Sequence, residues 1–275
     1  MYNNFLKIVI VTISFFLLLG CNNDNSDEKS AATNSDDSVS DGEITFYIVR
    51  HGKTMLNTTD RVQGWSDAVL TPNGEDVVQS AGRGMKNIEF KGAYSSDSGR
   101  AIQTADIILN ENGKSTDLHL KTDDRLREFN FGTYEGDLNE TMWTDIANSQ
   151  GKTLEEWFDK GISPEVFANS VAELDKENVK EEGVNWAAED YNTITTRLTD
   201  AINEIAELES KKGDGNVLIV SHGLSISALL DTLFEDFELP PDGLDNASVT
   251  VINYKDGEFS LGKINDLSYV EEGEE

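Results

Sequence analysis

The chain has 275 residues, and 37% of them are hydrophobic, which is enough to form the core of one large α/β domain or two small ones. Its 52 acidic residues outnumber its 22 basic residues, giving a formal net charge of −30. A charge of this sign repels the phosphate backbone, so we expect no nucleic-acid partner. Any site for a phosphorylated molecule must therefore be a local basic pocket in an acidic surface.

The N-terminal segment has the pattern of a signal peptide. Lys7 precedes an uncharged apolar stretch, residues 8–20, which is shorter than the roughly 20 residues that a membrane span needs. The stretch ends in Leu18-Leu19-Gly20-Cys21, which resembles the lipoprotein box of bacteria, where the cysteine is lipidated and becomes the new N-terminus. Cys21 is the only cysteine, so it cannot form an internal disulfide.

We therefore predict a signal peptide at residues 1–20 and a lipid anchor on Cys21, which would hold the protein outside the cytoplasm on the bacterial cell membrane. The alternative is an uncleaved anchor, or an ordinary secretory peptide in which Cys21 is incidental. Residues 22–42 are mostly Asn, Asp, Ser and Glu, so together with Cys21 they predict a disordered tether. The folded domain is expected at residues 43–275.

The folded domain opens with an apolar, β-branched and aromatic run, residues 44–49, that stops at Arg50-His51-Gly52. Its composition predicts a strand buried on both faces, as in a parallel sheet. Ligands of such sheets bind beyond the carboxyl ends of the strands, where Arg50 and His51 would emerge. Taken alone, a histidine after a strand is more often structural than functional.

A helix is predicted after the next loop. Thr71 suits its N-cap and Pro72 its first position, and the apolar residues Val77, Ala81, Met85 and Ile88 follow at helical spacing. A second strand is expected at residues 92–96, and Arg100 falls in the first turn of the helix that follows. A cation is mildly unfavourable at a helix N-terminus unless an anion compensates it, so this position favours an anion site.

The remaining elements are read in the same way. We expect a strand at 118–120 and then several short helices at about 139–182, which are anchored by Trp143, Trp157, Phe158 and Phe167. An amphipathic helix at about 186–208, a strand at 216–221 and a helix at 224–234 should follow. The last element is a hairpin of strands 249–254 and 259–264. Strands that alternate with helices indicate the α/β class. The expected fold is a three-layer α/β/α sandwich with a mainly parallel central sheet and a helical insertion over the site.

The strand at 216–221 repeats the pattern of the opening strand, because it ends in Ser221-His222-Gly223. Two of the three histidines in the chain therefore stand at equivalent strand ends. We expect one edge of the sheet to gather six polar side chains: Arg50, His51, Asn57, Arg100, Glu128 and His222.

This set suits phosphoryl transfer. Two guanidinium groups can bind phosphate oxygens, a neutral imidazole can act as a nucleophile, and a carboxyl group can protonate the leaving oxygen and then activate water. No cluster has the spacing of a metal site, and there is no GxxxxGK[ST] loop for a nucleotide, so no metal or cofactor is expected.

These residues resemble the histidine phosphatase superfamily, in its phosphoglycerate mutase-like branch (branch 1), over about residues 44–265. The matching pieces stand in the family's order: Arg50-His51-Gly52-Lys53-Thr54 with Asn57, Gln63-Gly64 with Asp67, Leu70-Thr71 with Gly74, Ser95-Ser96-Asp97 with Arg100 and Gln103-Thr104-Ala105, Leu126-Arg127-Glu128 with Phe131-Gly132 and Glu135-Gly136, and Ser221-His222-Gly223.

The resemblance implies a role for each matching residue. His51 would be phosphorylated and Glu128 would be the acid and base. The phosphate pocket would consist of Arg50, Arg100 and His222, with Asn57 as a secondary contact. The implied activity is metal-independent hydrolysis of a small phosphomonoester, and the oligomeric state stays open.

The sequence also departs from parts of the family. Lys53-Thr54 and Gly223 stand where the acid phosphatase and phytase branch has other residues, so that branch is disfavoured. The Gly-Glu-Ser segment that precedes the long helix in phosphoglycerate mutases has no match in residues 183–189, and no Arg-rich insertion follows Glu135-Gly136. A phosphoglycerate mutase or other phosphotransferase, and a non-catalytic module that binds a phosphorylated ligand, remain alternatives to the phosphatase.

Overall fold

The computed structural model describes residues 41–158, 163–181, 183–240 and 242–274. The predicted signal peptide, Cys21 and nearly all of the predicted tether lie outside the described residues. None of the described helices is long and apolar enough to cross a membrane.

One six-stranded sheet organises the described part of the chain, and its strands lie in the order β3-β2-β4-β1-β5-β6. The first four in this order are parallel, whereas β5 and β6 are antiparallel to their neighbours. The sheet is therefore mixed but mainly parallel, as predicted. The strands are β1 (Ile44–Arg50), β2 (Phe90–Ser95), β3 (Leu120–Thr122), β4 (Gly215–Ser221), β5 (Val249–Lys255) and β6 (Glu258–Leu261).

Side chains of β1 alternate between two cores. Ile44, Phe46 and Ile48 are buried in one hydrophobic cluster, whereas Val49 belongs to the other, with Tyr47 packed against it. Because successive side chains of a strand point to opposite faces, this alternation places β1 in the middle of a sheet that is covered on both sides. The sequence prediction of a doubly buried strand is confirmed.

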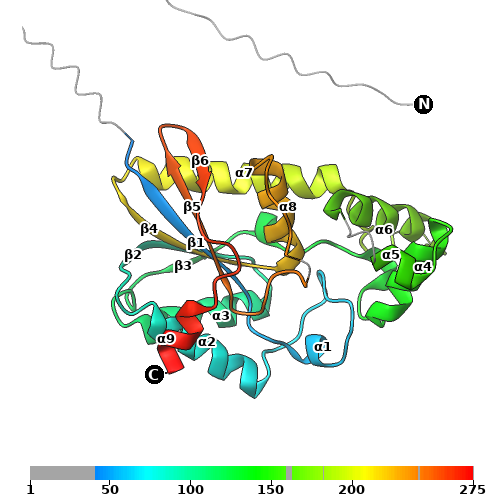
Figure 1. Ribbon diagram of the computed structural model, residues 1–275, viewed down its shortest axis with the longest axis horizontal. Helices are drawn as coiled ribbons and strands as arrows, with labels where there is room; N and C mark the ends of the chain where they lie inside the picture. The colour runs from blue at the N-terminus through cyan, green and yellow to red at the C-terminus, as the bar shows by residue number, and fades with distance from the viewer. Residues whose placement is uncertain (1–40, 159–162, 182, 241, 275) are drawn as a thin grey trace, which may run out of the picture. The chain divides into compact units, whose positions relative to one another are not determined.

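Helices form the two outer layers (Figure 1). One face of the sheet is covered by α2 (Pro72–Gly84), α3 (Gly99–Asn112) and α9 (Ser268–Glu274), and the other by α7 (Tyr191–Ser210) and α8 (Gly223–Leu233). The predicted insertion consists of α4 (Asn139–Ser149), α5 (Leu154–Phe158) and α6 (Pro164–Asn178), while α1 (Met55–Thr58) and the 3-10 turns Asp124–Leu126 and Gly132–Tyr134 lie in loops. The three-layer α/β/α sandwich is confirmed.

Local signals determine where α2 and the last hairpin begin and end. The Thr71 hydroxyl accepts a hydrogen bond of 3.0 Å from the backbone nitrogen of Gly74, and Pro72 opens α2 as predicted. Asp256 and Gly257, with φ of 52° and 86°, form the turn between β5 and β6. Positive φ at both central residues is typical of a type I′ hairpin turn.

The structure corrects several boundaries and anchors. The long helix α7 begins at Tyr191 rather than near Trp186, because Asp190 accepts a hydrogen bond of 2.8 Å from the Thr193 nitrogen and so acts as the N-cap. Trp186 is left 73% exposed, and Phe158, predicted as an anchor, is 48% exposed. The third strand lies two residues later than predicted, and α9 was not predicted.

Candidate active site

His51 lies directly after β1, and its backbone is fixed from three sides. The His51 nitrogen donates to the Ser221 carbonyl over 3.0 Å, its carbonyl accepts from the Asn246 amide over 2.9 Å, and the next nitrogen, of Gly52, donates to the Thr104 hydroxyl over 3.0 Å. A Cβ at Gly52 would lie 2.6 Å from a methyl carbon of Val78, so glycine is required where the chain passes α2.

The pairing of β1 with β4 brings the two predicted histidines together. The strands are parallel, with Arg50 opposite Ser221, so the residues that follow them, His51 and His222, lie side by side. Their ring centroids are 5.2 Å apart and the ring planes are inclined by 60°. The repeated strand-end pattern in the sequence therefore corresponds to one location in space.

A backbone hydrogen bond assigns the tautomer of His51. Its Nδ1 lies 2.8 Å from the Gly52 carbonyl oxygen. A carbonyl oxygen can only accept a hydrogen bond, so Nδ1 carries the proton and Nε2 keeps its lone pair. The unprotonated Nε2 is the atom that a nucleophilic role requires.

Both imidazoles are held in the neutral form. His51 is 4% exposed and His222 is fully buried. Burial, followed by the positive charges of Arg100 and Arg50, lowers the pKa of His51 well below its ordinary value of 6.5. Burial and then Arg100 also lower the pKa of His222 well below 6.5, so neither ring carries a charge near neutral pH.

Arg100 is the largest side chain that is fully buried in the described residues. Its Nη1 donates to Asp67 over 2.8 Å and its Nη2 donates to the Gly64 carbonyl over 2.8 Å. Its Nε has no partner within the described part of the chain. A buried donor without a partner costs roughly 1–3 kcal/mol, so this atom points to a ligand.

Arg50 shows the same feature. It donates from Nη1 to the Leu244 carbonyl, while its buried Nε has no partner among the described residues. Burial lowers the pKa of Arg50, and the nearby charges of Glu128 and Asp245 oppose this shift. Both ring nitrogens of His222 also lack partners within the described ranges. Three of the four predicted phosphate ligands therefore present buried polar atoms that no described group satisfies.

Glu128 is held by the N-terminus of α8. Its Oε1 accepts three hydrogen bonds: from the Phe129 nitrogen (3.0 Å), the Ser225 nitrogen (2.9 Å) and the Ser225 hydroxyl (3.0 Å). Its Oε2 accepts one, from the Leu224 nitrogen over 3.1 Å. Oε2 is therefore the oxygen with capacity left for a proton or a reacting group.

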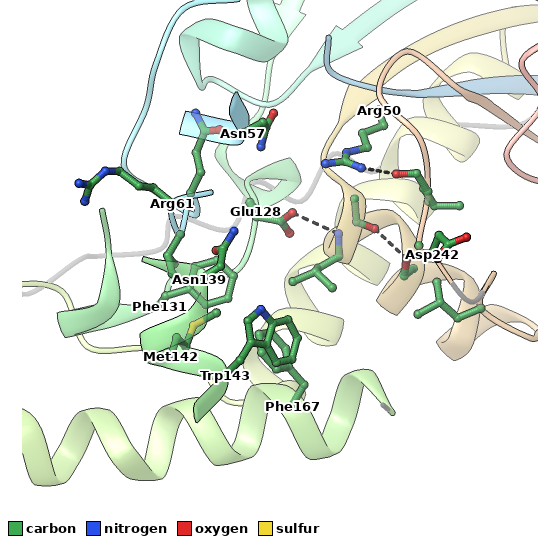
Figure 2. Close-up of a pocket in the computed structure, with 18 residues that line it drawn as sticks. Arg50, Asn57, Arg61, Glu128, Phe131, Asn139, Met142, Trp143, Phe167 and Asp242 are labelled. Carbon is green, nitrogen blue, oxygen red and sulfur yellow. Dashed lines mark hydrogen bonds between the residues drawn. The ribbon is translucent and has the colours of Figure 1, made fainter. Parts of the chain in front are cut away.

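The site opens into a pocket of about 400 Å³ (Figure 2). Arg50, Asn57 and Glu128 line it, whereas His51, Arg100 and His222 are buried and are not among the lining residues. The Asn57 side-chain oxygen accepts from the Thr54 nitrogen over 3.1 Å and so caps α1. Asn57 thus lies at the pocket, and its predicted contact with phosphate stays a prediction.

The sequence did not indicate Arg197, which supports the loop that carries Glu128. Arg197 donates to the backbone carbonyls of Arg125, Arg127 and Glu128 over 2.7–2.9 Å, and it pairs with Glu189 over 2.8 Å. Glu189 in turn accepts from the Asn130 nitrogen over 3.0 Å. The long helix predicted from the sequence included Glu189. In the structure α7 starts later, so Ala188-Glu189-Asp190 form the segment before the helix, where Glu189 can pair with Arg197.

The carboxylate of Glu135, which the sequence placed in a matching motif without a role, shapes the loop beside Arg100. Glu135 accepts hydrogen bonds of 2.8–3.1 Å from the backbone nitrogens of Gly64, Trp65 and Ser66. The loop carbonyls of Gly64 and Ser66 can then accept from Arg100. Within the described ranges, no group of three His, Cys, Asp or Glu side chains is arranged to hold a metal ion.

Residues 46–176 and 165–267 match the model of a family described as the histidine phosphatase superfamily (branch 1). The chain belongs to this superfamily. The resemblance seen in the sequence motifs is therefore confirmed.

Named relatives include both mutases and phosphatases. The chain is 31% identical to fructose-2,6-bisphosphatase TIGAR of Xenopus laevis over 72% of its own length and 79% of the relative. It is 30% identical to the probable phosphoglycerate mutase GpmB of Yersinia enterocolitica over 78% and 86%. The crystal structure of phosphoglycerate mutase from Bacillus anthracis str. Sterne superposes with a TM-score of 0.78 at 38% identity, covering 86% of this chain and 99% of that one.

Proposed function

We propose that this protein hydrolyses small phosphomonoesters through a phosphohistidine intermediate at His51. The observation that carries the proposal is a set of buried atoms on Arg50, Arg100 and His222 that have no partner among the described residues and lie around an imidazole held neutral. These atoms match the oxygens of a phosphoryl group, which can accept several hydrogen bonds and compensates the positive charge.

In the first step, Nε2 of His51 attacks phosphorus and a P–N bond forms while the ester P–O bond breaks. The electron pair of the broken bond stays on the leaving oxygen, and Glu128 supplies the proton that turns it into an alcohol. Arg50, Arg100 and His222 stabilise the charge on the three non-bridging oxygens.

In the second step, water attacks the phosphoryl group on the opposite side from the P–N bond. Glu128, now ionised, takes a proton from this water, and inorganic phosphate leaves as the lone pair returns to Nε2. The enzyme regains neutral His51 and protonated Glu128, so the cycle balances without a metal or an external co-reactant.

The direct test is turnover of p-nitrophenyl phosphate by the purified domain in EDTA. We expect hydrolysis with the unaltered protein and a loss of at least about 10³-fold with His51→Ala, because the nucleophile is removed. His119→Ala is the matched control, since His119 is exposed and lies outside the site. Hydrolysis that survives His51→Ala would refute the mechanism, and so would a failure to trap phosphate on His51.

A phosphoglycerate mutase is the second candidate, favoured by the 38% identity to a structure of that name. Among the described residues that line the pocket, Arg61 is the one cationic residue besides Arg50, and its side chain already donates to the Gly136 carbonyl over 2.7 Å. Such a pocket suits a monophosphate better than a substrate with a second strong negative charge. Isomerisation of 3-phosphoglycerate, with and without 2,3-bisphosphoglycerate, distinguishes the two activities.

A non-catalytic module that binds a phosphorylated ligand is the remaining alternative. It requires phosphate binding without labelling of His51 or turnover. Isothermal titration with inorganic phosphate, run beside a labelling experiment, separates this outcome from catalysis. The presence of both the predicted nucleophile and the predicted acid in one site argues for turnover.

We further propose that the protein acts outside the cytoplasm, held on the bacterial cell membrane by a lipid on Cys21. The support is the apolar segment before Leu18-Leu19-Gly20-Cys21. Metabolic labelling with a fatty acid tests this: the full chain should incorporate label and Cys21→Ala should not. Labelling that persists in Cys21→Ala, or a fully soluble full-length protein, would contradict the proposal.

A further inference from the structure

One side of the pocket beyond Arg50 and Glu128 is apolar. The side chains that form this part come from the loop after Glu128, from the helical insertion and from the loop after α8: Phe131, Met142, Trp143, Phe167, Leu239 and Leu244. Figure 2 shows Trp143 and Phe167 together on the side of the pocket opposite Arg50. We call the six residues the apolar wall.

Aromatic packing holds the apolar wall in place. The rings of Trp143 and Phe167 stack with centroids 4.7 Å apart and planes inclined by 29°. Phe131 meets Phe167 edge to face, with centroids 6.0 Å apart. Phe167 is 1% exposed, whereas Trp143 is only partly buried, so Trp143 offers the accessible aromatic surface. A rigid ring of this kind binds a flat apolar group with little loss of conformational entropy.

The charges around the apolar wall disfavour an anionic leaving group. Arg61 lines the pocket, but it is exposed, it donates to the Gly136 carbonyl, and Figure 2 shows its guanidinium turned away from Arg50 and Glu128. Asp242, an acidic residue, lines the pocket as well. A carboxylate or a second phosphate would therefore meet an acidic residue, and the other polar side chains that line this part of the pocket are uncharged amides and a hydroxyl.

We propose that the leaving group of the substrate is an uncharged alcohol with an apolar or aromatic body, which lies against Trp143 while its phosphate binds at Arg50, Arg100 and His222. This inference rests on the proposed phosphatase function and narrows it to a substrate class. The arginines and His222 would stabilise the charge of the phosphate, and the apolar wall would bind the body of the alcohol by removing its apolar surface from water. A volume of about 400 Å³ lies within the usual range of small-molecule pockets.

The test compares 2-phenylethyl phosphate with ethyl phosphate. Both release primary alcohols of similar acidity, so their chemical steps are comparable and the ratio of kcat/KM reports on the apolar body. We expect the unaltered enzyme to favour 2-phenylethyl phosphate by about tenfold or more, mainly through a lower KM, because each buried CH₂ contributes about 0.8 kcal/mol. 3-Phosphoglycerate should be a poor substrate, with kcat/KM below that of ethyl phosphate.

Trp143→Ala should reduce the preference for the phenyl group to about threefold or less, because kcat/KM falls more for 2-phenylethyl phosphate than for ethyl phosphate. Trp186→Ala is the matched control, because Trp186 is 73% exposed and does not line this pocket, and it should keep the full preference. A preference that is unchanged in Trp143→Ala would overturn the proposal.

An inhibition experiment on the unaltered enzyme guards against misfolding of the variant. 2-Phenylethylphosphonate should inhibit hydrolysis of p-nitrophenyl phosphate about tenfold more tightly than ethylphosphonate. Equal inhibition by the two, with hydrolysis intact, overturns the substrate class and leaves the phosphatase function standing. Absence of hydrolysis of every phosphate ester overturns the proposed function itself.

Discussion

Arg197 on α7 donates a hydrogen bond of 2.9 Å to the backbone oxygen of Glu128, although 69 residues separate them in sequence. The same guanidinium spans the carbonyls of Arg125 and Arg127 and pairs with Glu189. One side chain therefore determines the path of the loop that presents the predicted acid. Arg197 does not line the pocket, so we interpret it as a positioning residue.

Arg197→Lys should lower kcat about 10–100-fold with a smaller effect on KM, because a lysine ammonium cannot bridge three carbonyls and a carboxylate in one plane. Steady-state kinetics with p-nitrophenyl phosphate measure the split between kcat and KM. Arg83→Lys is the control, since Arg83 lies on α2 with a partly exposed side chain. An Arg197→Lys enzyme with normal kcat and KM would show that the loop does not depend on this contact.

Glu128→Gln should affect alkyl phosphates more than aryl phosphates. An alkoxide needs a proton as it leaves, whereas p-nitrophenolate leaves without one, so only the first depends on the acid. We expect a fall in kcat of about 10²–10⁴-fold for ethyl phosphate. In single-turnover experiments, the rate at which p-nitrophenol is released should fall by about tenfold or less. Equal losses for both substrates would mean that Glu128 is not the general acid.

The acid limb of the pH profile should lie below pH 6.5. Burial and the charges of Arg100 and Arg50 disfavour protonation, so the pKa of His51 is lowered and the neutral nucleophile persists as the pH falls through 6.5. Activity assigned to this group is full above pH 6.5 and is lost only as the pH falls through the lowered pKa. The check is kcat/KM for p-nitrophenyl phosphate across the acid range. If the acid limb that belongs to His51 had its half-maximal activity at or above pH 6.5, the pKa of His51 would not be lowered and the expectation would be wrong.

Asp175 on α6 should be important for stability. It is 1% exposed, and its carboxylate accepts from the backbone nitrogens of Thr133 over 2.7 Å and Ala188 over 2.8 Å. Asp175→Ala removes two hydrogen bonds to a buried carboxylate, which should lower the free energy of unfolding by about 2–4 kcal/mol. Urea unfolding measures the change, and Glu177→Ala, an exposed site on the same helix, should change it by less than about 0.5 kcal/mol. A loss for Asp175→Ala as small as that of the control would contradict this role.

The sequence by itself determined the local elements and the ends of the two central strands. The β-branched runs before Arg50-His51-Gly52 and before Ser221-His222-Gly223 predict two strands that each end at a histidine. This prediction needs only local sequence, because the alternation of side chains along a strand and the glycine that ends it involve neighbouring residues. Thr71 and Pro72 likewise predict where α2 begins. The sequence was less informative where a competing cap, Asp190, delayed the start of α7, and where Phe158 turned out to be exposed.

Only the tertiary structure decided how these pieces meet. The parallel register of β1 and β4 places the rings of His51 and His222 5.2 Å apart, and burial of both rings lowers their pKa values. The contact of Arg197 with Glu128 and the stack of Trp143 on Phe167 join distant segments, so no spacing in the sequence encodes them. Register, burial and long-range packing depend on the whole chain at once. These three decide the protonation state of the predicted nucleophile, the position of the predicted acid and the shape of the apolar wall.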